Sequence, residues 1–212
     1  PSKLVAGVTA VYGADYVQRV YGEILPIPVD RIIEAPDGHV ISLNGRELVC
    51  LDTPGHARHH ICIVDHKAKA IFTGDMFGLS YRELDVDGRQ FIFPTTTPTQ
   101  FEPDEMRASI KRLVALQPQA MYLTHYSQVP EVQAQGAELL RHLDALVAMA
   151  QGEQGAGEQR HARIKQKMTD YLLAEIRRHG CQLPESTLLD IWATDLELNA
   201  QGLGVWLDSR KA

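Results

Sequence analysis

The chain lacks any hydrophobic run long enough to cross a membrane, since no segment approaches the ~20 apolar residues of a spanning helix. It also lacks the basic and then apolar start that is typical of a secretory signal. Basic residues are outnumbered, with 21 Lys and Arg against 27 Asp and Glu, whereas nucleic-acid-binding surfaces are usually basic. These absences argue against membrane and nucleic-acid partners.

Cysteine is scarce, with only Cys50, Cys62 and Cys181. The three form no C-x-x-C pair and cannot all pair with one another, which favours a reducing, cytoplasmic location. Cys50 and Cys62 lie in apolar runs and are predicted to be small core residues. The sequence has no Gly-x-Ser-x-Gly elbow and no cysteine with an evident histidine partner, which disfavours serine and thiol hydrolases.

The 212 residues suggest one domain, with or without an appendage. Residues 36–74 contain consecutive short apolar runs that predict strands, and Asn44-Gly45 predicts a tight hairpin between the first two. The helical patterns fall at about residues 8–21, at 103–117, and repeatedly after residue 130. We therefore expect an α/β body over residues 1–129 and a helical extension over residues 130–212.

Three predicted strands end in a side chain that can bind a metal. The segments are Thr-Pro-Gly-His56, Thr-Gly-Asp75 and Leu-Thr-His125. Functional residues gather on loops at strand ends, and neutral imidazole and carboxylate are ligands preferred by Zn²⁺ and non-haem Fe²⁺. Each segment alone has an ordinary alternative as a turn, a helix cap or a hydrogen-bonded surface residue.

In this order, with an amphipathic helix before the last strand, the three segments together resemble the metallo-β-lactamase superfamily. The resemblance covers about residues 37–126 and is closer to hydroxyacylglutathione-hydrolase-like members than to antibiotic-destroying ones. It implies an α/β (α+β) fold, here a partial αβ/βα four-layer sandwich with the C-terminal helices added. It also implies that His56 binds one metal, His125 binds a second, and Asp75 bridges both as the catalytic carboxylate.

One part of the family pattern is missing. The motif His-x-His-x-Asp-His matches no segment, and His39 is the only histidine before His56. Two explanations stay open: the chain is the C-terminal part of a longer enzyme, or it descends from such an enzyme and has lost its metal. The abrupt start at Pro1 and the three retained donors favour the first. We expect one face or edge of the sheet to lack its usual cover.

Neighbouring residues are candidates for supporting roles. Tyr81 and Arg82 could bind a substrate carboxylate or phosphate, although a surface salt bridge to Glu83 or Asp85 would also account for the arginine. Tyr126 could donate a hydrogen bond to a developing oxyanion, or it could simply be packed.

Two residues could orient a metal ligand by contacting that ligand without binding the metal themselves. Asp52 could do so as a carboxylate, or it could merely end a strand. His60 follows His59, and strand alternation would send the two to opposite faces, so at most one of them points to the site.

The resemblance implies a metal-dependent hydrolase, in which a metal-bound hydroxide attacks an ester, thioester or lactone-type carbonyl of a small molecule. The intact enzyme would hold two Zn²⁺ ions, with Fe²⁺ as an alternative, and this chain alone would be inactive. The other interpretations are a metal-free binding or assembly module and a mono-iron sulfur dioxygenase of the same fold. The expected partner is a second copy in a homo-oligomer such as a dimer, or a missing N-terminal segment.

Overall fold

The computed structural model describes residues 2–96, 100–125 and 127–210 and divides the chain into two compact units, Pro1–Glu34 and Ala35–Ala212. The first unit contains α1 (Ser2–Tyr12), α2 (Ala14–Tyr21) and a 3₁₀ helix, η1 (Val29–Arg31). A single helix over residues 8–21 is therefore wrong. The helix breaks at Gly13, whose φ of 83° is outside the helical region and is accessible to glycine because it has no Cβ.

The second unit is built on one six-stranded sheet in the order β1-β2-β3-β4-β5-β6. Its strands are β1 (His39–Leu43), β2 (Arg46–Asp52), β3 (Ile61–Asp65), β4 (Ala70–Gly74), β5 (Ala120–Leu123) and β6 (Gln128–Val129). Neighbouring strands are antiparallel except β4 and β5, which are parallel. This parallel pair requires a crossover, and α3 (Pro103–Ala115) provides its helix.

The hairpin between β1 and β2 forms as predicted. Asn44 and Gly45 have φ values of 52° and 83°, the two positive angles that a type I′ turn needs. The register pairs Leu43 with Arg46 directly across this turn.

One face of the sheet forms the core with the helices. Five buried residues lie on this face and come from β2, β3, β4 and β5: Leu51, Cys62, Val64, Ile71 and Met121. From α3 the predicted apolar stripe supplies Met106, Ile110 and Leu113, each with no exposed surface. Cys50 and Cys62 are fully buried, as the sequence predicts.

The opposite face of the sheet is partly exposed. Phe72 is 47% exposed and Tyr122 38%, and their rings stack with centroids 5.4 Å apart. Ile61 and Leu43, on the same face, are also exposed. Within the second unit, the helices cover one face of the sheet and leave these side chains of the other face partly exposed. The expectation that one face or edge of the sheet lacks its usual cover stays a prediction.

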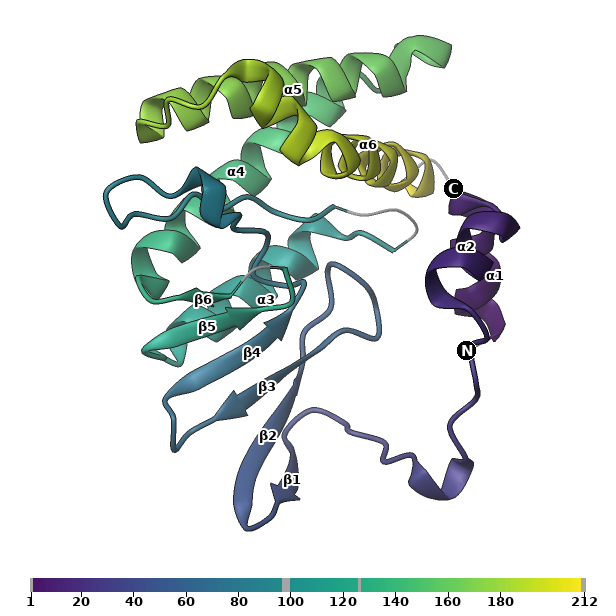
Figure 1. Ribbon diagram of the computed structural model, residues 1–212, viewed down its shortest axis with the longest axis vertical. Helices are drawn as coiled ribbons and strands as arrows, with labels where there is room; N and C mark the ends of the chain where they lie inside the picture. The colour runs from purple at the N-terminus through teal and green to yellow at the C-terminus, as the bar shows by residue number, and fades with distance from the viewer. Residues whose placement is uncertain (1, 97–99, 126, 211–212) are drawn as a thin grey trace. The chain divides into compact units, whose positions relative to one another are not determined.

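The helices after residue 130 are α4 (Val132–Gly152), α5 (Arg160–His179) and α6 (Glu185–Ser209), with a 3₁₀ turn, η3 (Gly157–Gln159), before α5. They gather on the β6 side of the sheet (Figure 1) and contribute residues such as Leu139, Leu172 and Trp192 to the same core as the strands. The boundary expected at residue 129 stays a prediction, since the residues on either side of it lie within the second unit. Among the described helices, none is both long and apolar enough to cross a bilayer.

Candidate metal centre

The sheet topology brings the three predicted metal-binding side chains to one edge. β2 and β4 are both antiparallel to β3, and β5 is parallel to β4. The carboxyl ends of β2, β4 and β5 therefore lie at the same edge. His56 follows β2 after a short loop, Asp75 directly follows β4, and His125 follows β5 by two residues.

The side chains converge on the carboxylate. The Nε2 atom of His56 lies 3.5 Å from Oδ2 of Asp75, and the Nε2 atom of His125 lies 3.2 Å from Oδ1 of Asp75. Each histidine thus faces a different carboxylate oxygen. This is the arrangement expected of a carboxylate between two neighbouring ions rather than one that closes on a single ion.

The hydrogen bonds of His56 assign its tautomer. The hydroxyl of Thr95 donates to the main-chain carbonyl of Asp75 at 3.1 Å, so its oxygen accepts the bond from Nδ1–H of His56 at 2.8 Å. Burial lowers the pKa of His56, which favours the neutral ring. The Nε2 atom then presents a lone pair to a carboxylate oxygen, and two facing acceptors are favourable only with a proton or a cation between them.

The pKa of the second histidine, His125, shifts in the opposite direction. The hydrogen bond with Asp75 raises the pKa of His125, and the same contact lowers the pKa of the Asp75 carboxyl. The side chain of His125 is 48% exposed, against 16% for His56. A cation that binds here would compete with the proton on His125, so binding would release that proton.

His60 fixes the backbone of Asp75 rather than facing the carboxylate. The main-chain N–H of Asp75 donates to Nε2 of His60 at 3.1 Å, so Nδ1 carries the proton and donates to the hydroxyl of Thr53 at 3.0 Å. That hydroxyl contacts Cys62 Sγ at 3.2 Å, and Cys62 Sγ donates to the carbonyl of Thr73 at 3.3 Å. The chain of bonds ties the ends of β2, β3 and β4 together.

Two glycines allow this close approach. Gly74 has a φ of 53°, and a Cβ there would lie 2.5 Å from Nε2 of His60. Gly55, immediately before His56, has a φ of 134°, and a Cβ there would collide with the main chain of Met106 in α3. Only glycine fits both the conformation and the space.

The donors fit zinc or iron in kind and orientation, but not in number. In a tetrahedral zinc site, ligand atoms about 2.0–2.1 Å from the metal are about 3.3 Å apart, close to the 3.5 and 3.2 Å seen here. Asp75 Oδ1 is buried and lies 3.2 Å from His125 Nε2. However, each ion would receive two protein donors, fewer than the three of a catalytic zinc site. Within the described residues, no three such side chains converge as a complete metal site.

Tyr81 and Arg82, which the sequence offered as substrate-binding candidates, contact neighbouring residues in the structure. The Tyr81 hydroxyl donates to Asp195 of α6 at 2.5 Å. Arg82 binds the carbonyl of Ser80 and lies 3.4 Å from Asp85, the salt bridge that the sequence offered as its alternative.

Two predicted supporting residues remain without a role shown at the site. The side chain of Asp52 is exposed at the end of β2, and its hydrogen bonds run through its main chain. Tyr126 lies outside the described residues.

Sequence reasoning missed two contributors. Thr95 lies in a Pro- and Thr-rich loop, where nothing in the local pattern distinguishes it from its neighbours. Asp195 lies on α6, far along the chain, where an acid looks like an ordinary solvent-facing residue. Burial raises the pKa of Asp195, and the charge of His125 opposes the rise. The helical extension therefore reaches the His125 side of the site.

Comparisons with known proteins agree with the topology. A model of the "Metallo-beta-lactamase superfamily" matches residues 5–125, more than half of the chain. The "Metallo-beta-lactamase fold-containing protein ST1585" of Sulfurisphaera tokodaii is 29% identical over 107 residues, which are 50% of this chain and 37% of that protein. The crystal structure of ST1585 superposes with a TM-score of 0.51 and 27% identity, covering 69% of this chain and 51% of ST1585.

Two further similarities cover a short segment in one case and the fold alone in the other. The "Acyl-coenzyme A thioesterase MBLAC2" of Gallus gallus is 39% identical over 51 residues, 24% of this chain and 18% of that protein. TTHA1429 from Thermus thermophilus shares the fold, with a TM-score of 0.55 and 15% identity over all of this chain and 60% of TTHA1429. The matches span less than two thirds of each of these proteins. The strand order, the shared edge and the matched family model place this chain in the metallo-β-lactamase superfamily.

Proposed function

We propose that this chain carries part of the metal centre of a hydrolase that acts on an ester- or thioester-type carbonyl. One observation carries the proposal: two histidine Nε2 atoms lie 3.5 and 3.2 Å from the two oxygens of one carboxylate. These distances match the spacing of ligands around a shared ion. Membership of the superfamily supports the reaction class, although one fold hosts many reactions.

In the proposed centre, His56 and Asp75 would hold one ion, and His125 and Asp75 a second. Such ions lower the pKa of a bound water and polarise a carbonyl. The protein's own contribution is to fix the donors. Thr95 holds His56 with its Nε2 toward the carboxylate, and His60 holds the main chain of Asp75. Donors held in this way lose little conformational entropy when an ion binds.

A thioester is the carbonyl substrate we favour. The support is the partial similarity to a protein named as an acyl-coenzyme A thioesterase. Zinc is the favoured metal because the donor set is imidazole and carboxylate, which also suits iron. A single iron would instead support a dioxygenase of the same fold, and no metal would support a binding module.

The test is elemental analysis combined with a thioester assay. The protein is reconstituted separately with Zn²⁺ and Fe²⁺, dialysed, and its metal content measured. Release of free thiol from an acyl thioester is then followed. We expect this chain to retain zinc, the retention to be lost in His56→Ala and Asp75→Ala and kept in His66→Ala, a control at an exposed turn. We expect thiol release by this chain to stay at background, because each ion has only two protein donors. Zinc retention that is the same in all variants, or no retention of metal at all, would overturn the proposal.

A further inference from the structure

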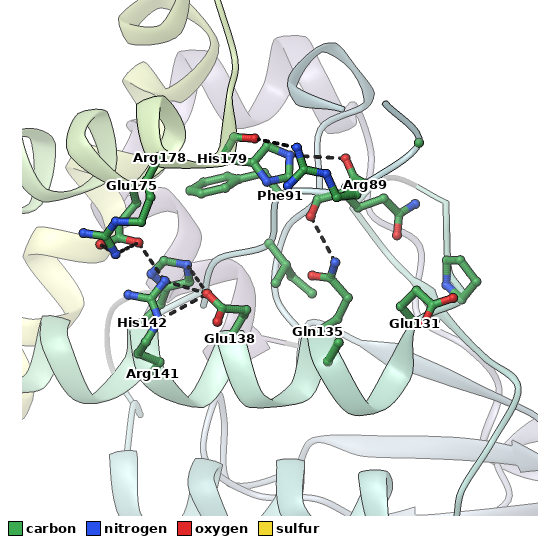
Figure 2. A pocket seen from close by; sticks show the side chains of 15 residues that line it. Arg89, Phe91, Glu131, Gln135, Glu138, Arg141, His142, Glu175, Arg178 and His179 are labelled. Atoms are coloured by element: carbon green, nitrogen blue, oxygen red, sulfur yellow. Dashed lines mark hydrogen bonds and ion pairs between the residues drawn. The ribbon is translucent and has the colours of Figure 1, made fainter. Parts of the chain in front are cut away.

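A pocket separate from the metal centre lies between residues 88–92, α4 and α5 (Figure 2). Its volume is about 440 Å³, within the range of sites that bind small molecules. None of the residues assigned above to the metal centre lines it. No step proposed for hydrolysis uses it.

The inner wall of the pocket is aromatic and uncharged. The Phe91 ring is buried, and the rings of His142 and His179 lie with their centroids 5.6 Å from it. Burial lowers the pKa of His142 to about 4 and also lowers the pKa of His179. Both imidazoles are therefore neutral near pH 7, and the wall offers ring faces to an apolar group.

The charges deep in the pocket are already compensated. Glu175 is buried on α5 and lies between two arginines, 2.7 Å from Arg141 and 2.9 Å from Arg178. Arg141 also contacts Glu138 one turn earlier on α4. This cluster uses two of the three arginines that line the pocket.

Two exposed residues of opposite charge at the pocket have no ionic partner among the described residues. Arg89 donates to the carbonyl of His179 at 3.1 Å but pairs with no carboxylate. Glu131, at the start of α4, pairs with no cation. Figure 2 shows Arg89 on the side of Phe91 and His179, and Glu131 on the α4 side.

A buried acceptor lies between these walls. The Gln90 side chain lines the pocket, and its Nε2 donates to the carbonyl of Gln128 at 2.7 Å. This bond fixes the amide orientation, since the flipped form would place two oxygens together. The Oε1 atom is buried and has no hydrogen bond to any described residue. A buried acceptor without a partner is costly, although this atom has almost no surface open to the pocket.

We propose that this pocket binds a zwitterionic small molecule with an aromatic body, namely a free aromatic α-amino acid. The ligand carboxylate binds the Arg89 guanidinium, which suits carboxylates geometrically. The ligand ammonium is attracted to Glu131. The side chain packs against the wall formed by Phe91, His142 and His179. A zwitterion is favoured over a simple anion or cation because the unpartnered charges are one of each sign.

The experiment is calorimetric titration of the protein with L-phenylalanine, 2-phenylethylamine and 3-phenylpropionate. The last two lack the carboxylate and the ammonium, respectively. We expect saturable binding of phenylalanine, and binding of each analogue weaker by about tenfold or more, the usual value of a charge-assisted hydrogen bond. No saturation by about 10 mM phenylalanine, corresponding to an affinity weaker than most specific sites, would overturn the proposal. Analogues that bind equally well would also overturn it.

Matched variants assign the two ends of the ligand. Arg89→Gln should weaken phenylalanine about tenfold and leave 2-phenylethylamine unchanged. Glu131→Gln should weaken phenylalanine and leave 3-phenylpropionate unchanged. Glu158→Gln, an exposed acid outside the pocket, should change nothing. Thermal melts of each variant establish that it is folded, and equal effects of the Glu131 and Glu158 substitutions would refute the assignment. The metal-centre proposal is unaffected by any of these outcomes.

Discussion

His142 should make the stability of this protein sensitive to mild acid. The residue is 2% exposed on α4, and its Nδ1 lies 2.8 Å from the hydroxyl of Tyr171. Burial is the largest cause that lowers its pKa to about 4. The charged and titratable groups that face it come from both α4 and α5: Glu138, Arg141, Tyr171, Glu175 and Arg178.

The sign follows from the two protonation states. An unfolded histidine has a pKa of about 6.5, and the folded His142 has one of about 4. Between these values the unfolded chain binds the proton and the folded chain does not. Stability is therefore fully present above about pH 6.5 and falls as the pH decreases toward 4. The loss from this one group is about 2 kcal/mol between pH 7 and pH 5, and about 3 kcal/mol when complete.

Urea unfolding at about pH 7 and pH 5 tests this magnitude. The wild type should lose about 2 kcal/mol more than His142→Gln over this range, because the variant has no group to titrate. His66→Gln, at an exposed turn, should behave as the wild type. NMR titration of the His142 ring protons should give a midpoint near the lowered pKa of about 4. An equal pH dependence in wild type and His142→Gln, or a ring midpoint near 6.5, would refute the reasoning.

Three further predictions concern the sheet and its edge. His60→Ala removes the acceptor of the Asp75 main-chain N–H and should weaken zinc binding about 10–100-fold. Competition with a chelator measures the zinc affinity, and an unchanged affinity would count against the supporting role of His60. Gly74→Ala should destabilise the fold by about 1–3 kcal/mol, because its Cβ would contact His60. Gly152→Ala, where the space is open, is the control, and equal unfolding midpoints would contradict the steric argument. Phe72→Lys, on the exposed face, should reduce concentration-dependent self-association in light scattering, and a wild type that stays monomeric at all concentrations would contradict this.

The run of short strands over residues 36–74 and the hairpin at Asn44-Gly45 were predicted from the sequence, whereas the order of the strands in the sheet and the parallel pairing of β4 with β5 were not. Short apolar runs with an Asn-Gly turn predict consecutive strands, and the ends of alternate antiparallel strands must share an edge. His56, Asp75 and His125 were grouped through the resemblance to the superfamily, since β5 is parallel to β4 and lies outside this antiparallel series. The helix break at Gly13 was not predicted, because the apolar pattern continues through a residue whose φ depends on its local environment.

The positioning bonds could not be predicted because they depend on side-chain rotamers and loop paths. His59 and His60 are adjacent and chemically identical, and alternation along a strand would only place them on opposite faces. The structure distinguishes them through Gly74, whose missing Cβ leaves room for the His60 ring beside the Asp75 main chain. Thr95 is equally unremarkable in sequence, and it acts only because its loop returns to His56.

These positioning bonds explain why acceptor atoms can face one another at this edge. Bringing the neutral His56 Nε2 to 3.5 Å from a carboxylate oxygen is unfavourable for an unconstrained side chain, which would rotate away. Here rotation would break the bond to Thr95, and moving Asp75 would break its main-chain bond to His60. Each neutral bond contributes only about 1 kcal/mol, but the bond to His60 continues through Thr53 to the fully buried Cys62. The fold therefore holds His56 Nε2 and Asp75 Oδ2 3.5 Å apart, a spacing at which a proton or a cation bound by both atoms would be favourable.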